Sequence, residues 1–160
     1  MMNGLSRRDW LKMGAGASAF AGLGGCVAAG ESAAGNAATG PGLHELAAEK
    51  GIRFGSAMAA HQLDDPRYLD IIRRECATIV AENEHKWYTV YPEPDVVNFE
   101  PADRLAAFAK ENGLTMRGHT LLWHRSIWSP DWVNALEFAS AAETEAFVGP
   151  RIAQMASRYH

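Results

Sequence analysis

The sequence Thr78-Ile79-Val80-Ala81-Glu82-Asn83-Glu84-His85-Lys86-Trp87 contains the strongest indication of the fold in this chain. Its first four residues are a short apolar run, which is typical of a buried strand in a parallel sheet. Carboxylate, amide, imidazole, ammonium and indole groups follow this run at once. Because such groups are costly to bury unless a polar partner satisfies them, the stretch predicts a strand whose carboxyl end carries a ligand site.

A second stretch of the same kind lies further along the chain. Residues 114–118 predict a third short strand, which leads into Arg117-Gly118-His119-Thr120-Leu121-Leu122-Trp123-His124. A sugar ring has hydroxyl groups around its rim and C–H groups on its faces, so it suits a lining of amide, charged and indole side chains. Together the two stretches predict a carbohydrate site.

Strands and helices alternate around these two stretches. Residues 52–58 predict an earlier strand buried on both faces. Three helices are predicted from caps and from apolar residues at helical spacing. The first opens at Asp65-Pro66, and its apolar stripe is Leu69, Ile72 and Cys76. The second opens at Pro101 with the stripe Ala102, Leu105, Phe108 and Ala109, and the third opens at Ser140 with the stripe Val148, Ile152, Met155 and Tyr159. A short helix is expected at 43–50, and Asn112-Gly113 is expected to end the helix that Pro101 opens. An irregular connection is expected at 88–101, and a kink or restart at Pro150. This order predicts an α/β fold with a parallel sheet, whose carboxyl edge carries both polar stretches.

Composition limits the classes of function. The chain has 160 residues, of which 48% are hydrophobic, a formal charge of −4 and no basic stripe. Nucleic acid is therefore not expected as a partner. The two cysteines, Cys26 and Cys76, give no disulfide framework, and Cys76 is expected to be inert core.

Residues 1–26 predict an export signal. The paired arginines of Ser6-Arg7-Arg8-Asp9-Trp10-Leu11-Lys12 precede the apolar run Met13–Leu23, which is too short to span a bilayer permanently. This pattern resembles a bacterial twin-arginine signal, so the export machinery of that type is the expected partner. Leu23-Gly24-Gly25-Cys26 resembles a lipobox, in which Cys26 would be lipidated. The alternative is an ordinary cleaved signal with an incidental cysteine.

The expected location follows from this leader. Residues 27–42 are mostly Ala, Gly, Ser, Thr and Asn, and they predict a flexible tether to the globular part at 43–160. The protein is therefore expected in the periplasm or outside the cell. Its membrane contact would be a lipid on Cys26.

Five motifs in the globular part occur in an order that resembles one enzyme family. They are Phe54-Gly55-Ser56-Ala57, Asp65-Pro66-Arg67-Tyr68, Glu82-Asn83-Glu84-His85-Lys86-Trp87, Phe99-Glu100-Pro101-Ala102-Asp103 and Arg117-Gly118-His119-Thr120-Leu121-Leu122-Trp123-His124. Residues 43–160 thereby resemble the N-terminal part of glycoside hydrolase family 10, the endo-1,4-β-xylanases. The resemblance implies about three βα units of a (β/α)8 TIM barrel with a cleft for β-1,4-xylan or xylooligosaccharides. It also implies retaining hydrolysis by two glutamates, with neither a cofactor nor a metal.

The resemblance assigns roles to five residues. Glu82 and Asn83 match the pair that hydrogen-bonds the sugar two places from the cut, and Lys86 matches the cation between that sugar and the cleaved one. His119 and Trp123 match the wall around the cleaved ring. A cis peptide bond after His119 is implied as well.

The two catalytic glutamates have no counterpart within the chain. In the family the acid/base glutamate ends the fourth strand and the nucleophile lies on the seventh, so we expect both beyond His160. The chain is thus expected to be an N-terminal fragment, from a truncated gene or a partial record, that is inactive alone. A local departure lies at residues 125–132, which are slightly longer than the family's stretch and lack its glutamine.

Other interpretations of these residues stay open. One is a surface ion pair between Glu82 and Lys86 on a helix. Another is a zinc site at His119 and His124, although the glutamate that H-E-x-x-H requires is absent. At least one of three tryptophans, Trp123, Trp128 and Trp132, is expected to be core. For the whole protein, the alternatives are a non-catalytic exported xylan-binding lipoprotein and another polysaccharide-directed barrel enzyme.

Overall fold

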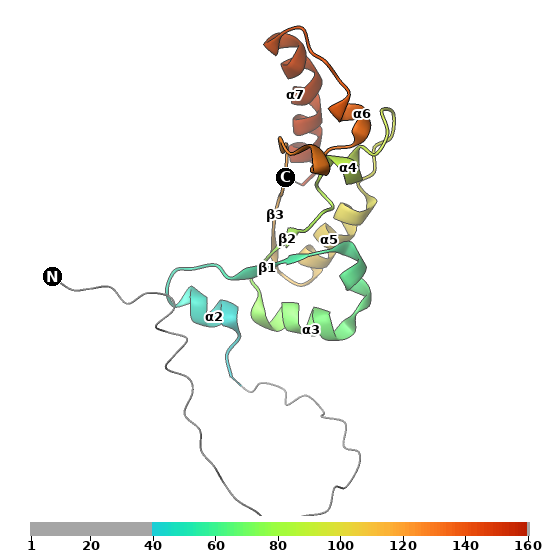
Figure 1. Ribbon diagram of the computed structural model, residues 1–160. Coiled ribbons are helices and arrows are strands. Elements are labelled where there is room, and N and C mark those ends of the chain that lie inside the picture. Colours follow the sequence, from blue (N-terminus) through green and yellow to red (C-terminus); the bar gives the residue numbers. More distant parts are fainter. Residues whose placement is uncertain (1–39, 160) are drawn as a thin grey trace, which may run out of the picture. The chain divides into compact units, whose positions relative to one another are not determined.

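The computed structural model of the protein describes residues 40–159 (Figure 1). The predicted export signal, Cys26 and the tether up to residue 39 lie outside the described residues. The elements, in chain order, are α2 (Leu43–Ala48), β1 (Gly55–Met58), η1 (Ala60–Asp64), α3 (Pro66–Glu75), β2 (Thr78–Ala81), α4 (Trp87–Val90), α5 (Glu100–Glu111), β3 (Thr115–Arg117), η2 (Ser126–Trp128), α6 (Asp131–Asn134) and α7 (Ala141–Arg158). No helix in this part of the chain is long and apolar enough to cross a membrane.

The three strands form one parallel sheet in the order β1-β2-β3. Met58 pairs with Ala81 and Val80 pairs with Arg117, so the carboxyl ends of the strands lie at one edge. The helices α3 and α5 are the crossover connections between neighbouring strands (Figure 1). The predicted alternation and parallel sheet are confirmed, and the loops after β2 and β3 start side by side.

Helix ends form where the sequence predicts them. Asp65 caps α3, because its Oδ1 accepts a 3.0 Å hydrogen bond from the backbone N–H of Arg67. Ser140 caps α7 in the same way, with its Oγ accepting from the N–H of Glu143 at 3.2 Å. Beyond the C-terminus of α5, Gly113 takes φ = +67°, a conformation that glycine adopts at no steric cost.

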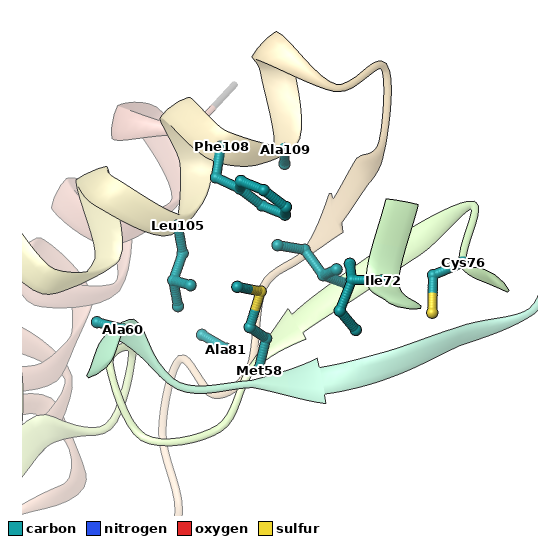
Figure 2. Close-up of a cluster of buried hydrophobic side chains, with 9 residues drawn as sticks. Met58, Ala60, Ile72, Cys76, Ala81, Leu105, Phe108 and Ala109 are labelled. Atoms are coloured by element: carbon teal, nitrogen blue, oxygen red, sulfur yellow. The ribbon is translucent and has the colours of Figure 1, made fainter. Parts of the chain in front are cut away.

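A hydrophobic core lies between the sheet and the helices α3 and α5 (Figure 2). Leu105 and Phe108 on α5 point toward Met58 on β1 and Ile72 on α3. Both helices therefore cover the same face of the sheet. The predicted helical stripes are buried at Ile72, Cys76, Ala102, Leu105, Phe108 and Ala109. Cys76 is a free thiol whose pKa is raised by burial, as suits a residue of the core.

The prediction for residues 52–58 is wrong in two respects. The strand begins at Gly55, and it is not buried on both faces, because Ala57 is exposed. Thr115 and Arg117 of β3 are exposed as well. The physical reason is that α3 and α5 pack on the opposite face, where they bury Met58. The sheet of the described part is therefore covered on one face.

Two further expectations need correction around α4 and α7. Residues of α4 are helical within the connection predicted to be irregular. Of the two alternatives predicted at Pro150, a kink or a restart, the restart is wrong, because α7 continues through Pro150 as one helix. A second apolar cluster joins these helices and consists of Trp87, Val90, Tyr91, Phe99 and Met155, with Phe147 packed against it. Phe147 before Pro150 and Met155 after it pack into this one cluster, so tertiary contacts outweigh the local preference of proline.

Candidate functional site

Two loops leave neighbouring strands at the same edge of the sheet and meet around Lys86. The loop after β2 carries Asn83 and Lys86, and the loop after β3 carries His119 and Trp123. Lys86 is 6% exposed, and its Nζ donates a 2.9 Å hydrogen bond to Oδ1 of Asn83. Within residues 40–159, none of the ion pairs involves Lys86. Its ammonium is thus buried without a carboxylate partner in this part of the chain.

Indole rings lie beside the Lys86 ammonium where a counterion would be expected. Its Nζ is 3.9 Å from the ring centroid of Trp128 and 5.5 Å from that of Trp123. The two indoles stack, with centroids 6.0 Å apart and planes 16° from parallel. A cation–π contact contributes about 2 kcal/mol when the cation is desolvated, so the aromatic pair offsets part of the cost of burying this charge.

Trp123 also joins the group to His119. The two rings meet edge to face, with centroids 5.8 Å apart and an interplanar angle of 63°. Asn83, Lys86, Trp123 and His119 therefore form one continuous series of contacts. The peptide bond between His119 and Thr120 is cis, as the family resemblance implied.

Glu82 takes a more open position than the other four predicted residues. Its backbone N–H donates to the carbonyl of Met58 at 3.0 Å, which extends the pairing of β1 and β2 by one bond. The side chain is exposed, and no ion pair joins it to Lys86, so the surface ion-pair interpretation is wrong. Burial raises the pKa of Tyr88, a hydrogen bond with Thr89 acts against this, and the charges of Glu84 and Glu82 add to the rise.

Glu84 has a role that the sequence analysis missed. It is 6% exposed, and its carboxylate oxygens accept hydrogen bonds from the backbone N–H groups of Ala60 (2.7 Å) and Asn83 (3.0 Å). Ala60 follows β1, so this carboxylate joins the loop after β1 to the loop after β2. The only sequence signal is the spacing of two residues from Glu82, which does not indicate which of the two carboxylates turns inward.

His85 joins the loops after β2 and β3, and it too was given no role from the sequence. Its Nδ1 accepts a hydrogen bond from the backbone N–H of His119 at 3.4 Å. A second link is the 2.6 Å hydrogen bond from Nε1 of Trp87 to the carbonyl of Leu121. Burial lowers the pKa of His85, which favours the neutral ring that can accept at Nδ1. A hollow of about 690 Å³ lies beside His85 and His119.

The described residues also bear on the zinc-site interpretation and on the core tryptophan that the sequence predicts. Among residues 40–159, no three His, Cys, Asp or Glu side chains lie close enough together to hold a metal ion, so a zinc site at His119 and His124 has no support there. The sequence predicts that at least one of three tryptophans is core, and the structure identifies Trp132 as that residue. It packs against the second apolar cluster, and its Nε1 donates to the carbonyl of Tyr91 at 2.9 Å.

The group offers hydrogen-bond donors and an aromatic surface in one place. An ammonium has three N–H donors, and Lys86 uses one of them on Asn83. The Asn83 amide adds its own NH2 donors, and the rings of Trp123 and His119 lie next to them. This combination suits a ligand with hydroxyl groups on its rim and apolar C–H faces.

The comparisons with known proteins agree with this chemistry. The sequence profile of glycosyl hydrolase family 10 matches residues 42–160. The chain belongs to this family. A β-1,4-xylanase from Dictyoglomus thermophilum is 37% identical over 82 residues, which cover 51% of this chain and 23% of the relative. Anti-sigma-I factor RsgI6 from Acetivibrio thermocellus is 36% identical over 84 residues, which cover 52% of this chain and 11% of that relative.

A solved structure of the family shares the fold. Xylanase 10B from Thermotoga petrophila RKU-1, solved in complex with xylobiose, is similar with a TM-score of 0.67 and 33% identity over 76% of this chain. The parallel sheet therefore corresponds to part of a TIM barrel. The present family 10 chain spans 37% of that solved chain and 23% of the Dictyoglomus relative.

Proposed function

We propose that this family 10 chain is the N-terminal portion of an endo-1,4-β-xylanase and supplies sugar-binding residues on the glycone side of its cleft. The observation that carries the proposal is the series of contacts from Asn83 through Lys86 and Trp123 to His119 at the carboxyl edge of the sheet. The xylobiose bound to a similar xylanase supports β-1,4-linked xylose as the ligand class.

Each residue has a chemistry that suits a xylose unit. The Asn83 amide and the Lys86 ammonium donate to sugar hydroxyls, and the exposed Glu82 carboxylate accepts from them. The rings of Trp123 and His119 cover the C–H surface of the sugar. Hydrogen bonds that strengthen as the cleaved ring flattens stabilise the transition state more than the ground state, so this group contributes to rate as well as to affinity.

We place the acid/base and nucleophile glutamates in a segment encoded after His160. Retaining glycosidases need two carboxyl groups about 5–5.5 Å apart. The family resemblance puts these groups on strands that follow β3, and the greater length of the xylanase relatives supports such a segment. On this proposal the 160-residue chain alone does not hydrolyse xylan.

The reading frame provides the test. We expect the codons that follow His160 to encode a Trp-Asp-x-x-Asn-Glu stretch, and the protein translated from the extended frame to hydrolyse xylan with retention of anomeric configuration, followed by NMR. Lys86→Met should lower kcat/KM by about 10- to 100-fold, the range expected for lost hydrogen bonds to a charged group. Lys50→Met, which removes an exposed lysine just after α2, is the matched control and should keep the activity. A stop codon after His160 followed by unrelated sequence refutes the proposal.

We also propose that the protein is exported by the twin-arginine route and anchored through Cys26. The support is the sequence pattern of residues 1–26. Replacing Arg7 and Arg8 together with lysine should retain the protein in the cytoplasm, and Cys26→Ser should abolish labelling by radioactive palmitate. Unchanged export of the double-lysine protein refutes the route, and an unlabelled wild-type protein refutes the anchor alone.

A further inference from the structure

The aromatic ring nearest the buried ammonium belongs to a residue with no assigned role. Trp128 lies on η2, within residues 125–132, which depart from the family's usual length. We propose that Trp128 is a positioning residue of the sugar site, whose indole face holds the Lys86 ammonium in place and thereby sets the affinity for xylooligosaccharides. This inference rests on the proposed function.

The geometry leaves Lys86 dependent on this ring. A lysine side chain is a flexible four-carbon stem, and the single hydrogen bond to Asn83 does not by itself fix it. The Trp128 centroid is 3.9 Å from Nζ, whereas the Trp123 centroid is 5.5 Å away. Without the nearer ring the ammonium would gain by turning toward water, because a long charged side chain keeps its head solvated where it can. The donors aimed at the sugar would then be lost.

The turn that carries Trp128 is itself fixed. The Nδ2 of Asn134 on α6 donates to the carbonyls of Ser126 (3.0 Å) and Ser129 (3.3 Å), which flank the ring on both sides along the chain. The N–H of Trp128 donates to the carbonyl of Arg125 at 3.0 Å. A ring held by its backbone in this way can order a flexible amine, and it contributes little entropy cost of its own.

Core packing does not account for Trp128. The residue is half-buried and belongs to neither apolar cluster of the described residues, in contrast to Trp87, which is 3% exposed. Its ring lies against Lys86 and Trp123 of the site and against Tyr88, which follows the site loop on α4. A ring placed among these residues acts on the site more than on the fold.

A double-mutant cycle on xylotriose binding tests the inference in the full-length protein by calorimetry. Trp128→Leu and Lys86→Met should each weaken binding by about tenfold, and the double variant by about the same factor, because both remove one interaction. Ile127→Ala is the matched control, since Ile127 lies on the same turn and is 66% exposed, and it should bind as the wild type does. Trp128→Phe, which keeps an aromatic face, should recover part of the loss.

The outcomes separate this inference from the proposed function. A wild type that binds no xylotriose refutes the proposed function, and the positioning role falls with it. In one outcome the wild type binds xylotriose and the losses of the two single variants add up, and in another the wild type binds while Trp128→Leu shows no loss. Either result refutes only the positioning role of Trp128 and leaves the proposed function standing. If Trp128→Leu does not fold, tryptophans of increasing fluorination placed at position 128 keep the shape and weaken the cation–π contact. Affinity should then fall stepwise, and a flat series overturns the inference.

Discussion

Replacing Glu84 with glutamine tests whether one buried carboxylate builds the site. In the wild-type protein its oxygens accept hydrogen bonds from the N–H groups of Ala60 at 2.7 Å and Asn83 at 3.0 Å. Glutamine keeps the shape and one acceptor oxygen, but it turns an NH2 group toward the second N–H, so that two donors meet. The variant therefore loses the charge and leaves one backbone donor without an acceptor.

The size of the effect follows from the burial of these groups. A hydrogen bond to a charged group contributes about 1.5–3 kcal/mol, and an unsatisfied buried donor costs about 1–3 kcal/mol. The Ala60 bond is the shorter one, and Ala60 is 7% exposed, so we expect the amide oxygen introduced by Glu84→Gln to keep that bond and release Asn83. The free energy of unfolding should fall by about 2–4 kcal/mol, a large share of the ~5–15 kcal/mol of a typical domain.

Urea titrations followed by tryptophan fluorescence measure this difference. The matched control is Glu82→Gln, two residues earlier, where the side chain is exposed and the change should stay within about 0.5 kcal/mol. Since Asn83 loses its backbone anchor, Glu84→Gln should also weaken xylotriose binding. Equal unfolding free energies for the two variants would show that the carboxylate does not hold the loops together, and the reasoning would be wrong.

Three other predictions concern the core, the sheet and pH. Leu105→Ala empties a fully buried position under α5 and should cost about 2–5 kcal/mol in the same titration, while Ile71→Ala, at a 53% exposed position, should cost far less. Gly55→Ala places a Cβ 2.1 Å from the backbone oxygen of Thr78, so amide hydrogen exchange along β1 and β2 should accelerate. Burial lowers the pKa of His85 below its ordinary 6.5, so the unfolded chain binds the proton first and stability should fall as the pH drops through 6.5. His85→Met should lose that pH dependence, and an unchanged dependence would assign it to another group.

Local features of the fold could be predicted because neighbouring residues determine them. The Asp65 cap and the stop at Gly113 depend only on a few adjacent residues. The face that a strand buries is different, because it depends on where distant helices pack. The apolar composition of residues 52–58 was therefore compatible with two covered faces, and only the placement of α3 and α5 shows that Ala57 is open.

The candidate site likewise contains some contacts that the sequence predicts and others that it does not. Asn83 and Lys86 are three residues apart in one loop, so their proximity follows from the sequence, and the order of the strands predicts that His119 comes near them. The inward turn of Glu84 depends on a partner 24 residues earlier, at Ala60, and no local pattern encodes it.

Three consecutive residues, Glu84, His85 and Lys86, explain why this edge of the sheet combines structure with ligand chemistry. All three are buried, at 6%, 3% and 6% exposure, although each is polar. Glu84 binds the loop after β1, His85 binds the loop after β3, and Lys86 turns into the site. These residues lie in a turn closed by the 2.9 Å hydrogen bond from the N–H of Lys86 to the carbonyl of Asn83, and in a turn successive side chains can reach different neighbouring loops. A loss of sugar binding in any variant here therefore has two physical origins, and only the unfolding free energy of the same variant separates a lost ligand contact from a displaced loop.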